Sequence, residues 1–490
     1  MKKAVIIGSG IGGLSLAIRL LARGFEVEIF EKSPYPGGHA NQIKEAGYTF
    51  DTGPTLITAP DMIENLFSLL GEKMNEHIDL RPLDPYYRIY FHDGSHFDYS
   101  GNIGSMIKQM EKFNKHDADN FLKFLNHSRK IYNAVIRDGL GSTPFNKVGT
   151  MMQFVPKALQ LGAFIPAYYL SSLYFRDFRH RFMFSFHPLF IGGNPFRVPA
   201  VYLMISYLEN TGGVWFAKGG MYNLIKALVN IIEKHGGKIH TGNEVKHIIT
   251  DNGRAQGVIT DNKKVNSDFV ISNADVTHTY SELIRDKRYT WTESKVERLK
   301  VSMSAFILYL GVRKKYPELL QHTLVLSERY KPLIDDIFDR NVLPEDFSLY
   351  MHIPSRTDES MAPDGCESIY VLAPVSNLKA KIDWEEKKEQ FAERIINHLE
   401  NELGLEDLKN NIELKKIVTP VDFKHLKNSH MGSPWSLEPV LLQTALFRPH
   451  NIDKNIMNFY LVGAGTHPGA GLPGVMLSAE ATDKLIKERQ

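Results

Sequence analysis

The sequence predicts an α/β fold in which an inserted α+β domain interrupts a Rossmann-type nucleotide-binding domain. Three observations support this prediction: a glycine-rich loop between a strand and a helix at the N-terminus, a second glycine-rich loop near the C-terminus, and strand-like segments between them. The chain has 490 residues, too many for one ordinary hydrophobic core, so we expect two domains or one large interrupted fold.

The N-terminal segment reads as a βαβ unit. AVIIG (Ala4 to Gly8) is apolar and rich in β-branched residues, as in a strand that is covered on both faces. GSGIGG follows, and IGGLSLAIRLLARG then has helical periodicity and ends at Gly24. FEVEIFEK alternates as a second strand and closes on Glu31.

The residues of this unit favour a bound dinucleotide. Gly8 permits a tight turn, Gly10 lets the backbone approach a pyrophosphate, and Gly13 lets the helix pack closely on the strand. The helix N-terminus would receive the phosphates. Glu31 would accept hydrogen bonds from both ribose hydroxyls and repel a 2′-phosphate. The alternative is a glycine-rich turn beside a surface glutamate.

Composition excludes several function classes. A net charge of +2 shows no global basicity, so no nucleic-acid partner is expected. The single cysteine, Cys366, excludes an intrachain disulfide framework and a multi-cysteine metal site, and it fits a reducing compartment. The apolar run before Gly8 is too short for a signal peptide, so we expect a cytoplasmic protein.

A pair of glycines favours FAD over NAD. Gly37 and Gly38 follow Glu31 closely in EKSPYPGGHA, where an NAD enzyme would continue with its next βα unit. The pair resembles the second flavin motif of the large family that contains amine oxidases, protoporphyrinogen oxidase and carotenoid desaturases. That family often has Arg after the pair, whereas this chain has His39, so only the backbone role is carried over with the motif.

The C-terminal loop is interpreted as the other end of the same FAD site. In NFYLVGAGTHPGAGLPGV (Asn458 to Val475), LVGAG reads as a strand in the same sheet as AVIIG, and a helix begins at about Gly474. The loop would wrap the isoalloxazine, and the positive end of the helix would favour the anionic reduced flavin. A second nucleotide site is disfavoured because GAGTHP does not complete GxGxxG. His467 is either a proton carrier or a loop residue bonded to backbone.

Six segments, in matching order and spacing, resemble bacterial phytoene desaturases across essentially the whole chain: FDTGPTLIT, FSFHPLFIGGNPF, GGVWFAKGGMYNLIKAL, VISNADVTHTY, PVLLQTALFRPHN and LVGAGTHPGAGLPGV. The resemblance implies an amine oxidase-like FAD fold and FAD-dependent desaturation of phytoene, a C40 polyene precursor, in successive two-electron steps towards lycopene. An allylic C–H would give hydride to flavin N5, and the neighbouring carbon would lose a proton. The protein would mainly position the substrate in a dry tunnel.

The motif and the resemblance together imply a set of cofactor contacts. Val245, in the alternating segment TGNEVKHIITDNGRAQGVITDNKKVNSDFVISNAD with DNGR and TDNKK as turns, would meet the adenine through its backbone or is a simple strand core residue. The expected cofactor-binding residues are Gly8, Ser9, Gly10, Gly13, Glu31, Lys32, Gly38, His39, Thr55, Val245, Gly465, Gly474 and Val475.

No general base follows from the resemblance. Accounts of the family consider an Arg–Asp pair near the flavin, but the nearest counterpart here, TPFNKVGTMMQF, contains no acid. Asp51 in FDTGP is the nearest acid in a matched motif, and it either serves chemistry or caps the turn after Phe50. The catalytic residues therefore stay open.

A membrane contact is expected because phytoene dissolves in bilayers. Residues 158 to 175 carry no charge and are interrupted by Pro166. Arg176, Arg179 and Arg181 follow and suit anionic headgroups. The stretch from about 151 to 181 is a membrane-dipping helical pair, a buried core of the substrate domain, or a spanning helix. The first reading predicts monotopic attachment to the cell membrane.

The FAD-binding domain is expected to be discontinuous, with residues 1–75, 213–285 and 450–490. The substrate domain would contain residues 76–212 and 286–449. Its second part includes the strand-like runs MSAFILYLGVRKKY, SLYMHIPS and ESIYVLAPV. It ends in an amphipathic helix, WEEKKEQFAERIINHLENELG, with one apolar side of Phe391, Ile395, Ile396 and Leu399.

Several other functions fit part of the sequence. They are a carotenoid isomerase or a saturase, a desaturase of C30 or hydroxylated carotenoids, and a non-enzymatic carotenoid-binding protein. An amine oxidase is disfavoured because the middle segments do not match one and Cys366 lies outside the C-terminal loop. With one complete dinucleotide fingerprint, stoichiometric NAD(P) is not expected, so the electron acceptor is oxygen or a membrane quinone.

Overall fold

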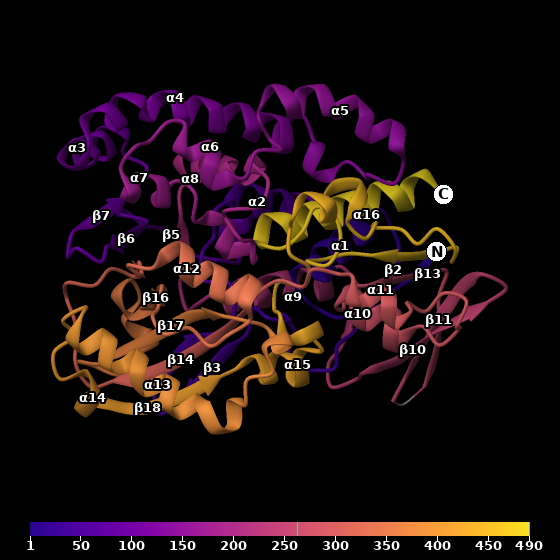
Figure 1. The fold of residues 1–490 in the computed structure, drawn as a ribbon. Helices are drawn as coiled ribbons and strands as arrows, with labels where there is room; N and C mark the ends of the chain where they lie inside the picture. The colour runs from indigo at the N-terminus through magenta and orange to yellow at the C-terminus, as the bar shows by residue number, and fades with distance from the viewer. Residues whose placement is uncertain (262, 490) are drawn as a thin grey trace.

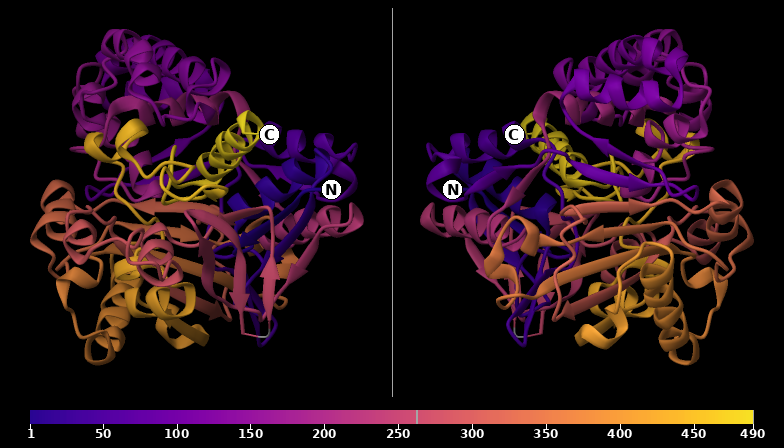
Figure 2. Two further views of the ribbon diagram at one scale, coloured as in Figure 1. Left: turned by 90° about the vertical axis from the view of Figure 1, so that its right-hand side faces the viewer. Right: turned by 90° about the vertical axis from the view of Figure 1, so that its left-hand side faces the viewer.

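The computed structural model describes residues 1–261 and 263–489. One centre of the fold is a five-stranded parallel sheet in which the N-terminal and C-terminal strands lie side by side with strands from the middle of the chain (Figures 1 and 2). Its order is β19-β13-β1-β2-β9, with β1 (Lys3–Ile7), β2 (Glu26–Phe30), β9 (Lys238–His240), β13 (Phe269–Ser272) and β19 (Phe459–Leu461). The predicted C-terminal strand in the sheet of AVIIG is thus confirmed, although it ends at Leu461.

Both faces of this sheet are covered, which explains the continuous apolar run of β1. Ala4 and Ile6 pack against a helical layer, whereas Val5 and Ile7 pack against a three-stranded antiparallel meander. The helices are α1 (Ile11–Ala22), α2 (Pro60–Leu69), α9 (Tyr222–Lys234) and α16 (Leu472–Glu488), and the meander is β10 (Val245–Asp251), β11 (Arg254–Thr260) and β12 (Lys264–Asn266). The predicted turn TDNKK includes Asn262, which lies outside the described residues.

A mixed seven-stranded sheet forms the second centre. Its order is β18-β14-β17-β16-β15-β6-β7, with β6 (Tyr87–Tyr90), β7 (His96–Tyr99), β14 (Ser304–Val312), β15 (His322–Val325), β16 (Leu349–His352), β17 (Glu367–Val375) and β18 (Ile412–Val418). One face packs on α13 (Trp384–Asn401), whose predicted apolar side is buried. The three strand-like runs noted in the sequence correspond to β14, β16 and β17. The proposed domain boundaries stay a prediction.

The remaining elements complete the walls around these two sheets. The helices of residues 103–212 form a layer on one side of the molecule, opposite α13 (Figures 1 and 2). They are α3 (Ile103–Phe113), α4 (Lys115–Tyr132), α5 (Val148–Gln160), α6 (Ala167–Ser172), α7 (Phe178–Met183) and α8 (Met204–Gly212). The other helices are α10 (Val276–His278), α11 (Glu293–Glu297), α12 (Tyr330–Asp335), α14 (Leu408–Asn411) and α15 (Pro420–Lys427). Two small sheets pair β3 (Gln42–Glu45) with β4 (Tyr48–Asp51), and β5 (Leu80–Pro82) with β8 (Trp215–Ala217).

The apolar stretch of residues 158–175 is broken, which corrects one reading of it. It contains the end of α5, a turn, and α6, which begins after Pro166. Within residues 1–261 and 263–489, no helix is long and apolar enough to cross a membrane, so the spanning reading is wrong. Ala167, Leu170 and Phe175 lie in a core, whereas Leu159 and Leu173 are exposed.

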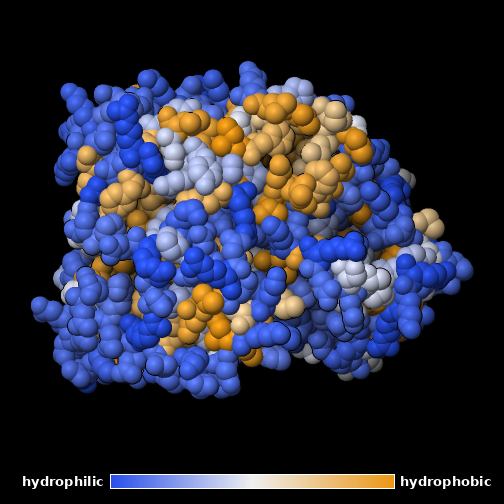
Figure 3. All heavy atoms as spheres, viewed as in Figure 1, coloured by the Kyte–Doolittle hydropathy of each residue, from blue (hydrophilic) through white to orange (hydrophobic). Residues whose placement is uncertain are grey.

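A hydrophobic surface lies over α5 instead. Val148, Met152 and Leu159 are 65%, 62% and 64% exposed, and their spacing places them on one side of the helix. Figure 3 shows hydrophobic residues gathered at the upper right, where α5 lies in Figure 1. An apolar stripe that faces outward on a surface helix is unusual for a helix that packs on a core.

The arginines after this stretch are not all free to meet headgroups. Arg176 is exposed. Arg179 pairs with Asp93 and Asp177 and stacks on aromatic rings, and the Arg181 Nε donates to the carbonyl of Phe175 at 2.9 Å. The predicted basic cluster is therefore mostly engaged within the protein.

Asp117 of α4 anchors the chain at this point. Its buried carboxylate accepts hydrogen bonds from the backbone N–H groups of Arg176 and Asp177, each at 2.9 Å, and lies 2.9 Å from the His180 Nδ1. Burial by itself would raise the pKa of Asp117, but these hydrogen bonds outweigh it and lower that pKa below its ordinary value.

Replacing this carboxylate should therefore destabilise the fold in a pH-dependent way. Asp117→Asn should lower the free energy of unfolding at pH 7 by about 1.5–3 kcal/mol, the range for hydrogen bonds to a charged group. Because the folded-state pKa is lowered, the contribution is complete above the unfolded value of about 3.9 and disappears as the pH falls through the folded pKa. Urea unfolding at pH 7 and pH 3 measures this difference.

The exposed neighbour Asp119 supplies the control, and Asp119→Asn should leave stability unchanged. Equal stability of wild type and Asp117→Asn at pH 7 would contradict the assigned anchoring role.

Candidate functional site: a cavity between the glycine loops and the second sheet

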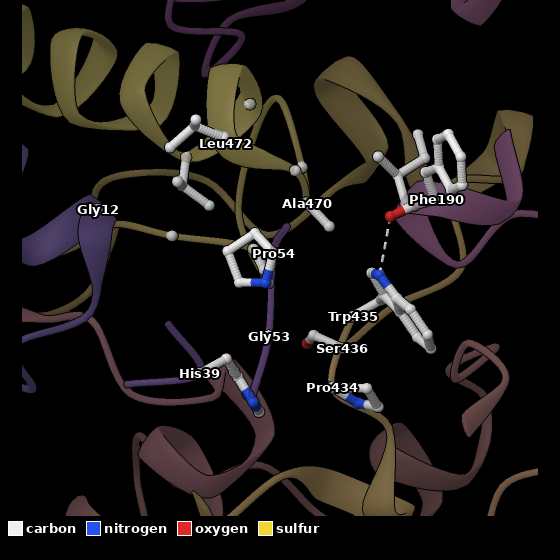
Figure 4. Close-up of a pocket in the computed structure, with 18 of the residues that line it drawn as sticks. Gly12, His39, Gly53, Pro54, Phe190, Pro434, Trp435, Ser436, Ala470 and Leu472 are labelled. Carbon is white, nitrogen blue, oxygen red and sulfur yellow. Dashed lines mark hydrogen bonds between the residues drawn. The ribbon is translucent and has the colours of Figure 1, made fainter. Parts of the chain in front are cut away.

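A cavity of about 680 Å³ lies between the two sheets. Its polar end is formed by the loops after β1 and β2 and by the C-terminal loop before α16. Its other end is apolar and is lined by Phe182, Phe186, Phe190 and the inner face of the seven-stranded sheet. In Figure 4, Gly53 and Pro54 lie opposite Trp435, whose Nε1 donates to the carbonyl of Phe190 at 2.9 Å.

Asn273, which follows β13, lies where the terminal loops meet. A Cβ atom on Gly10, Gly12 or Gly463 would stand 2.8 Å from its side-chain amide. Asn273 Nδ2 also lies 3.4 Å from the carbonyl oxygen of Gly8. The side chain therefore explains why three glycines from both ends of the chain leave this space free. Sequence reasoning singled out the segment VISNAD but missed this residue.

The two N-terminal glycine loops also touch. Gly10 and Gly37 form an isolated bridge, and the N–H of Gly37 donates to the carbonyl of Ser9 at 3.0 Å. Gly38 has a φ of +62°, and a Cβ there would stand 3.2 Å from the Cα of Gly10. A side chain at Gly10, Gly37 or Gly38 would fill the space beside these two loops, which we call the glycine cradle. Because glycine has no side chain, the backbone here stays open to a bulky anionic group.

Glu31 closes the polar end behind these loops. Its Oε2 accepts from the Ser9 N–H at 2.9 Å and from the Ser9 hydroxyl at 2.8 Å, while Oε1 accepts from the N–H of Ser33 at 2.9 Å. About one of the four acceptor positions of a carboxylate is left for a ribose hydroxyl. The expected pair of ribose contacts would need one of these internal bonds to change.

Two cations and one neutral histidine lie at the same end. The Lys427 Nζ of α15 donates to the carbonyl of Gly38 at 2.8 Å, and the Lys32 Nζ donates to Asn428 at 2.7 Å. Burial, with the nearby Lys427 ammonium, lowers the pKa of His39 to about 4, so this ring is neutral at pH 7. Lys427, which no sequence motif indicated, brings a second positive charge to this end of the cavity.

Arg448 supports the C-terminal loop from inside the protein. Its guanidinium is 1% exposed and donates to the carbonyls of Thr466 at 2.9 Å and Ala464 at 2.6 Å, and to two further carbonyls. Burial and Arg448 lower the pKa of His467 to about 3, so a proton-carrier role for this histidine is unfavourable. The backbone of Leu140 and Gly141 lies near the ring and raises that pKa in part, although neither ring nitrogen makes a well-aligned hydrogen bond within the described residues.

The cavity collects most of the predicted cofactor residues. Ser9 and Gly13 do not line it: Ser9 positions Glu31, and a Cβ on Gly13 would stand 2.5 Å from the carbonyl of Gly8, as expected where a helix packs on a strand. Those that line it are Gly8, Gly10, Glu31, Lys32, Gly38, His39, Thr55, Val245, Gly465, Gly474 and Val475. Their individual contacts with a cofactor stay predictions.

Acidic groups are scarce in the apolar part of the cavity. Asp51 does not line it, and instead of capping the turn after Phe50 its Oδ1 accepts from the N–H of Met221 at 2.8 Å. Glu209 of α8 does line the wall, but its Oε2 accepts from the Tyr87 hydroxyl at 2.6 Å. This buried glutamate lies outside every motif that the sequence offered.

The comparisons agree with this geometry. Residues 11–482 match the model of the flavin containing amine oxidoreductases. The chain is 41% identical to a lycopene-forming phytoene desaturase of Pantoea ananas, over 100% of this chain and 99% of that one, and 38% identical to a neurosporene-forming phytoene desaturase of Cereibacter sphaeroides, over 99% and 95%. A solved putrescine oxidase variant shares the fold, with a TM-score of 0.63 over 100% and 99% of the chains at 14% identity. The chain therefore belongs to the flavin-containing amine oxidoreductases and, within them, to the phytoene desaturases.

FAD, the cofactor of this family, fits the site. The glycine cradle leaves the backbone open to phosphates. Two helices, α1 and α16, start at the cavity wall, where their N-termini present free N–H groups. The predicted α/β fold and flavin cofactor are thus confirmed.

Crowding at Gly13 makes a direct prediction. Gly13→Ala should force α1 away from β1, lower stability by about 1–3 kcal/mol, and release FAD, because the added methyl meets backbone that cannot move aside. The measurements are the flavin absorbance of the purified protein and its thermal midpoint. Gly149→Ala, on the exposed side of α5 with open space around it, is the control. Full flavin content in Gly13→Ala would contradict the packing argument.

Proposed function

We propose that this protein desaturates phytoene in successive two-electron steps towards lycopene, with FAD as the oxidant. The observation that carries the proposal is the continuity of one cavity from the glycine cradle to an aromatic, apolar end. A hydrocarbon offers no polar handle, so shape and exclusion of water must position it. The family membership supports the same substrate class.

The residues of the chain divide the chemical work. FAD supplies the acceptor for the hydride equivalent of an allylic C–H bond. The aromatic wall of Phe182, Phe186 and Phe190 would hold the polyene and keep water away from the reacting carbons. Pro54 and Ala470 lie between this wall and the glycine loops, at the place where the two ligands would meet (Figure 4).

Substrate access from a membrane is a further part of the proposal. The exposed stripe of Val148, Met152 and Leu159 would enter the lipid surface. Ala158, next to Leu159, and the following Ala163 and Phe164 line the cavity, so a lipid-soluble chain has a short path inward. The protein would then be a cytoplasmic, monotopic membrane protein that passes electrons to oxygen or to a membrane quinone.

Production with a phytoene synthase in a colourless host tests the reaction. The expected result is coloured polyenes with fine-structured visible absorption, because each step lengthens the conjugated system. Accumulation of phytoene beside FAD-loaded protein would contradict the proposal. A changed isomer without longer conjugation would favour the isomerase alternative, and conversion only of a C30 or hydroxylated precursor would favour those substrates.

Vesicle binding tests the membrane contact. Met152→Glu with Leu159→Glu should weaken binding to phosphatidylcholine–phosphatidylglycerol vesicles at least about tenfold, because two side chains of roughly 1.5–3 kcal/mol each no longer enter the lipid. Sedimentation with vesicles measures the bound fraction. Val342→Glu, at an exposed apolar residue elsewhere, should bind like wild type. Unchanged binding of the double variant would rule out this stripe as the contact.

A further inference from the structure

Desaturation of a hydrocarbon must release a proton as well as a hydride, and the apolar end of the cavity offers few groups to receive it. We propose that Tyr350 accepts this proton and that His322 and His352 conduct it to Asp51. This inference rests on the proposed desaturation reaction. It assigns a role to a buried polar row that the cofactor site does not use.

The register of the second sheet brings these residues together. His322 of β15 pairs directly with His352 of β16, and two positions along, Leu324 pairs with Tyr350. Because strand side chains alternate, all four lie on one face of the sheet. Leu324 and Tyr350 line the cavity, whereas the histidine pair is fully buried beside it. The row therefore leads from the cavity wall into the protein.

A chain of short contacts follows this row. The Tyr350 hydroxyl lies 2.5 Å from the Thr55 hydroxyl and 2.8 Å from the His322 Nδ1. The imidazole rings of His322 and His352 are stacked, with their Nδ1 atoms 3.3 Å apart.

The far end of the row holds two buried polar atoms that lack a hydrogen-bond partner among the described residues. They are the His352 Nε2 and the Asp51 Oδ2, and they lie 3.5 Å apart. Buried polar atoms without a hydrogen bond are costly, and a proton held between this contact pair would give each of them one.

The His322 ring is held neutral and can accept a proton. Burial, with His352 beside it, holds the pKa of His322 well below its ordinary value, so the ring rests neutral with a lone pair toward Tyr350. With Nε2 of each ring protonated, both Nδ1 atoms are acceptors, and a proton that arrives on the His322 Nδ1 is 3.3 Å from the next acceptor, the His352 Nδ1. Burial raises the pKa of Tyr350, so its hydroxyl stays protonated and can donate.

The C–H bond beside the carbon that loses hydride breaks, its electron pair forms the new double bond, and the proton binds the Tyr350 oxygen as that hydroxyl gives its own proton to the His322 Nδ1. This proton passes to the His352 Nδ1, and the His352 Nε2 proton moves to the Asp51 carboxylate. Glu209 is the competing acceptor, because it lines the cavity and its Oε1 has no hydrogen-bond partner among the described residues, while its Oε2 is turned toward Tyr87 and His187. A slow Glu209→Gln variant beside a fast Tyr350→Phe variant would assign the proton to Glu209 and overturn the relay.

Single substitutions in the row test the relay with the FAD-loaded full chain, phytoene vesicles and a quinone. Tyr350→Phe and His322→Gln should keep FAD but slow product formation by about 10²-fold or more, the usual contribution of general acid–base catalysis. Their solvent deuterium isotope effects should differ from that of wild type. Tyr309→Phe is the matched control: Tyr309 of β14 lies on the same face of the sheet as His352, and its hydroxyl donates to the carbonyl of Thr52 at 3.5 Å.

Each result either supports or overturns the proposed proton relay. Rates of Tyr350→Phe within about threefold of Tyr309→Phe, or an unchanged isotope effect in a slow variant, would overturn the relay. If Tyr350→Phe loses FAD, the rate and isotope effect of His322→Gln test the relay in its place. Loss of FAD from both variants would overturn the relay and assign the row a structural role. Failure of wild type to convert phytoene would overturn the proposed function itself, a result distinct from active wild type with active variants.

Discussion

The structure depends on one close contact between segments from the two ends of the chain. Asn273 occupies the space that side chains at Gly10, Gly12 and Gly463 would need, so the N-terminal and C-terminal loops approach each other across it. Because β1, β13 and β19 are neighbours in one parallel sheet, their loops emerge at the same edge. The two glycine loops, one from each end of the chain, thereby form a single site for FAD.

The second sheet explains how an oily substrate can lie beside a charged cofactor. Its inner face is apolar where it lines the cavity, through residues such as Leu324 and Leu372, and polar where it runs behind the loop that follows β4, through His322 and His352. The boundary between the two parts falls at Tyr350. The cations Lys32 and Lys427 lie at the opposite, nucleotide end, where they can neutralise phosphates away from the apolar part of the cavity.

The sequence predicts those structural features that depend on a short segment of the chain. The first βα unit, the C-terminal strand and the amphipathic α13 follow from local spacing and periodicity. The sequence does not indicate Lys427 or Arg448, because their roles depend on carbonyls brought close only by the fold. The sequence also does not indicate which apolar residues of 158–175 are exposed. The exposed stripe lies on α5, and its first residues, Val148 and Met152, precede that run. Asp51 bonds the N–H of Met221, a partner too distant in sequence for any turn motif to indicate.

The proposed reaction requires a single flavin and a hydrocarbon to share one cavity. Anaerobic mixing of the FAD-loaded protein with phytoene vesicles, without any electron acceptor, tests this most directly. We expect one FAD per chain, and we expect the oxidised-flavin absorbance to disappear in proportion to the conjugated polyene that forms. Longer conjugation with the flavin still oxidised, or a folded chain that takes up no FAD, would contradict it.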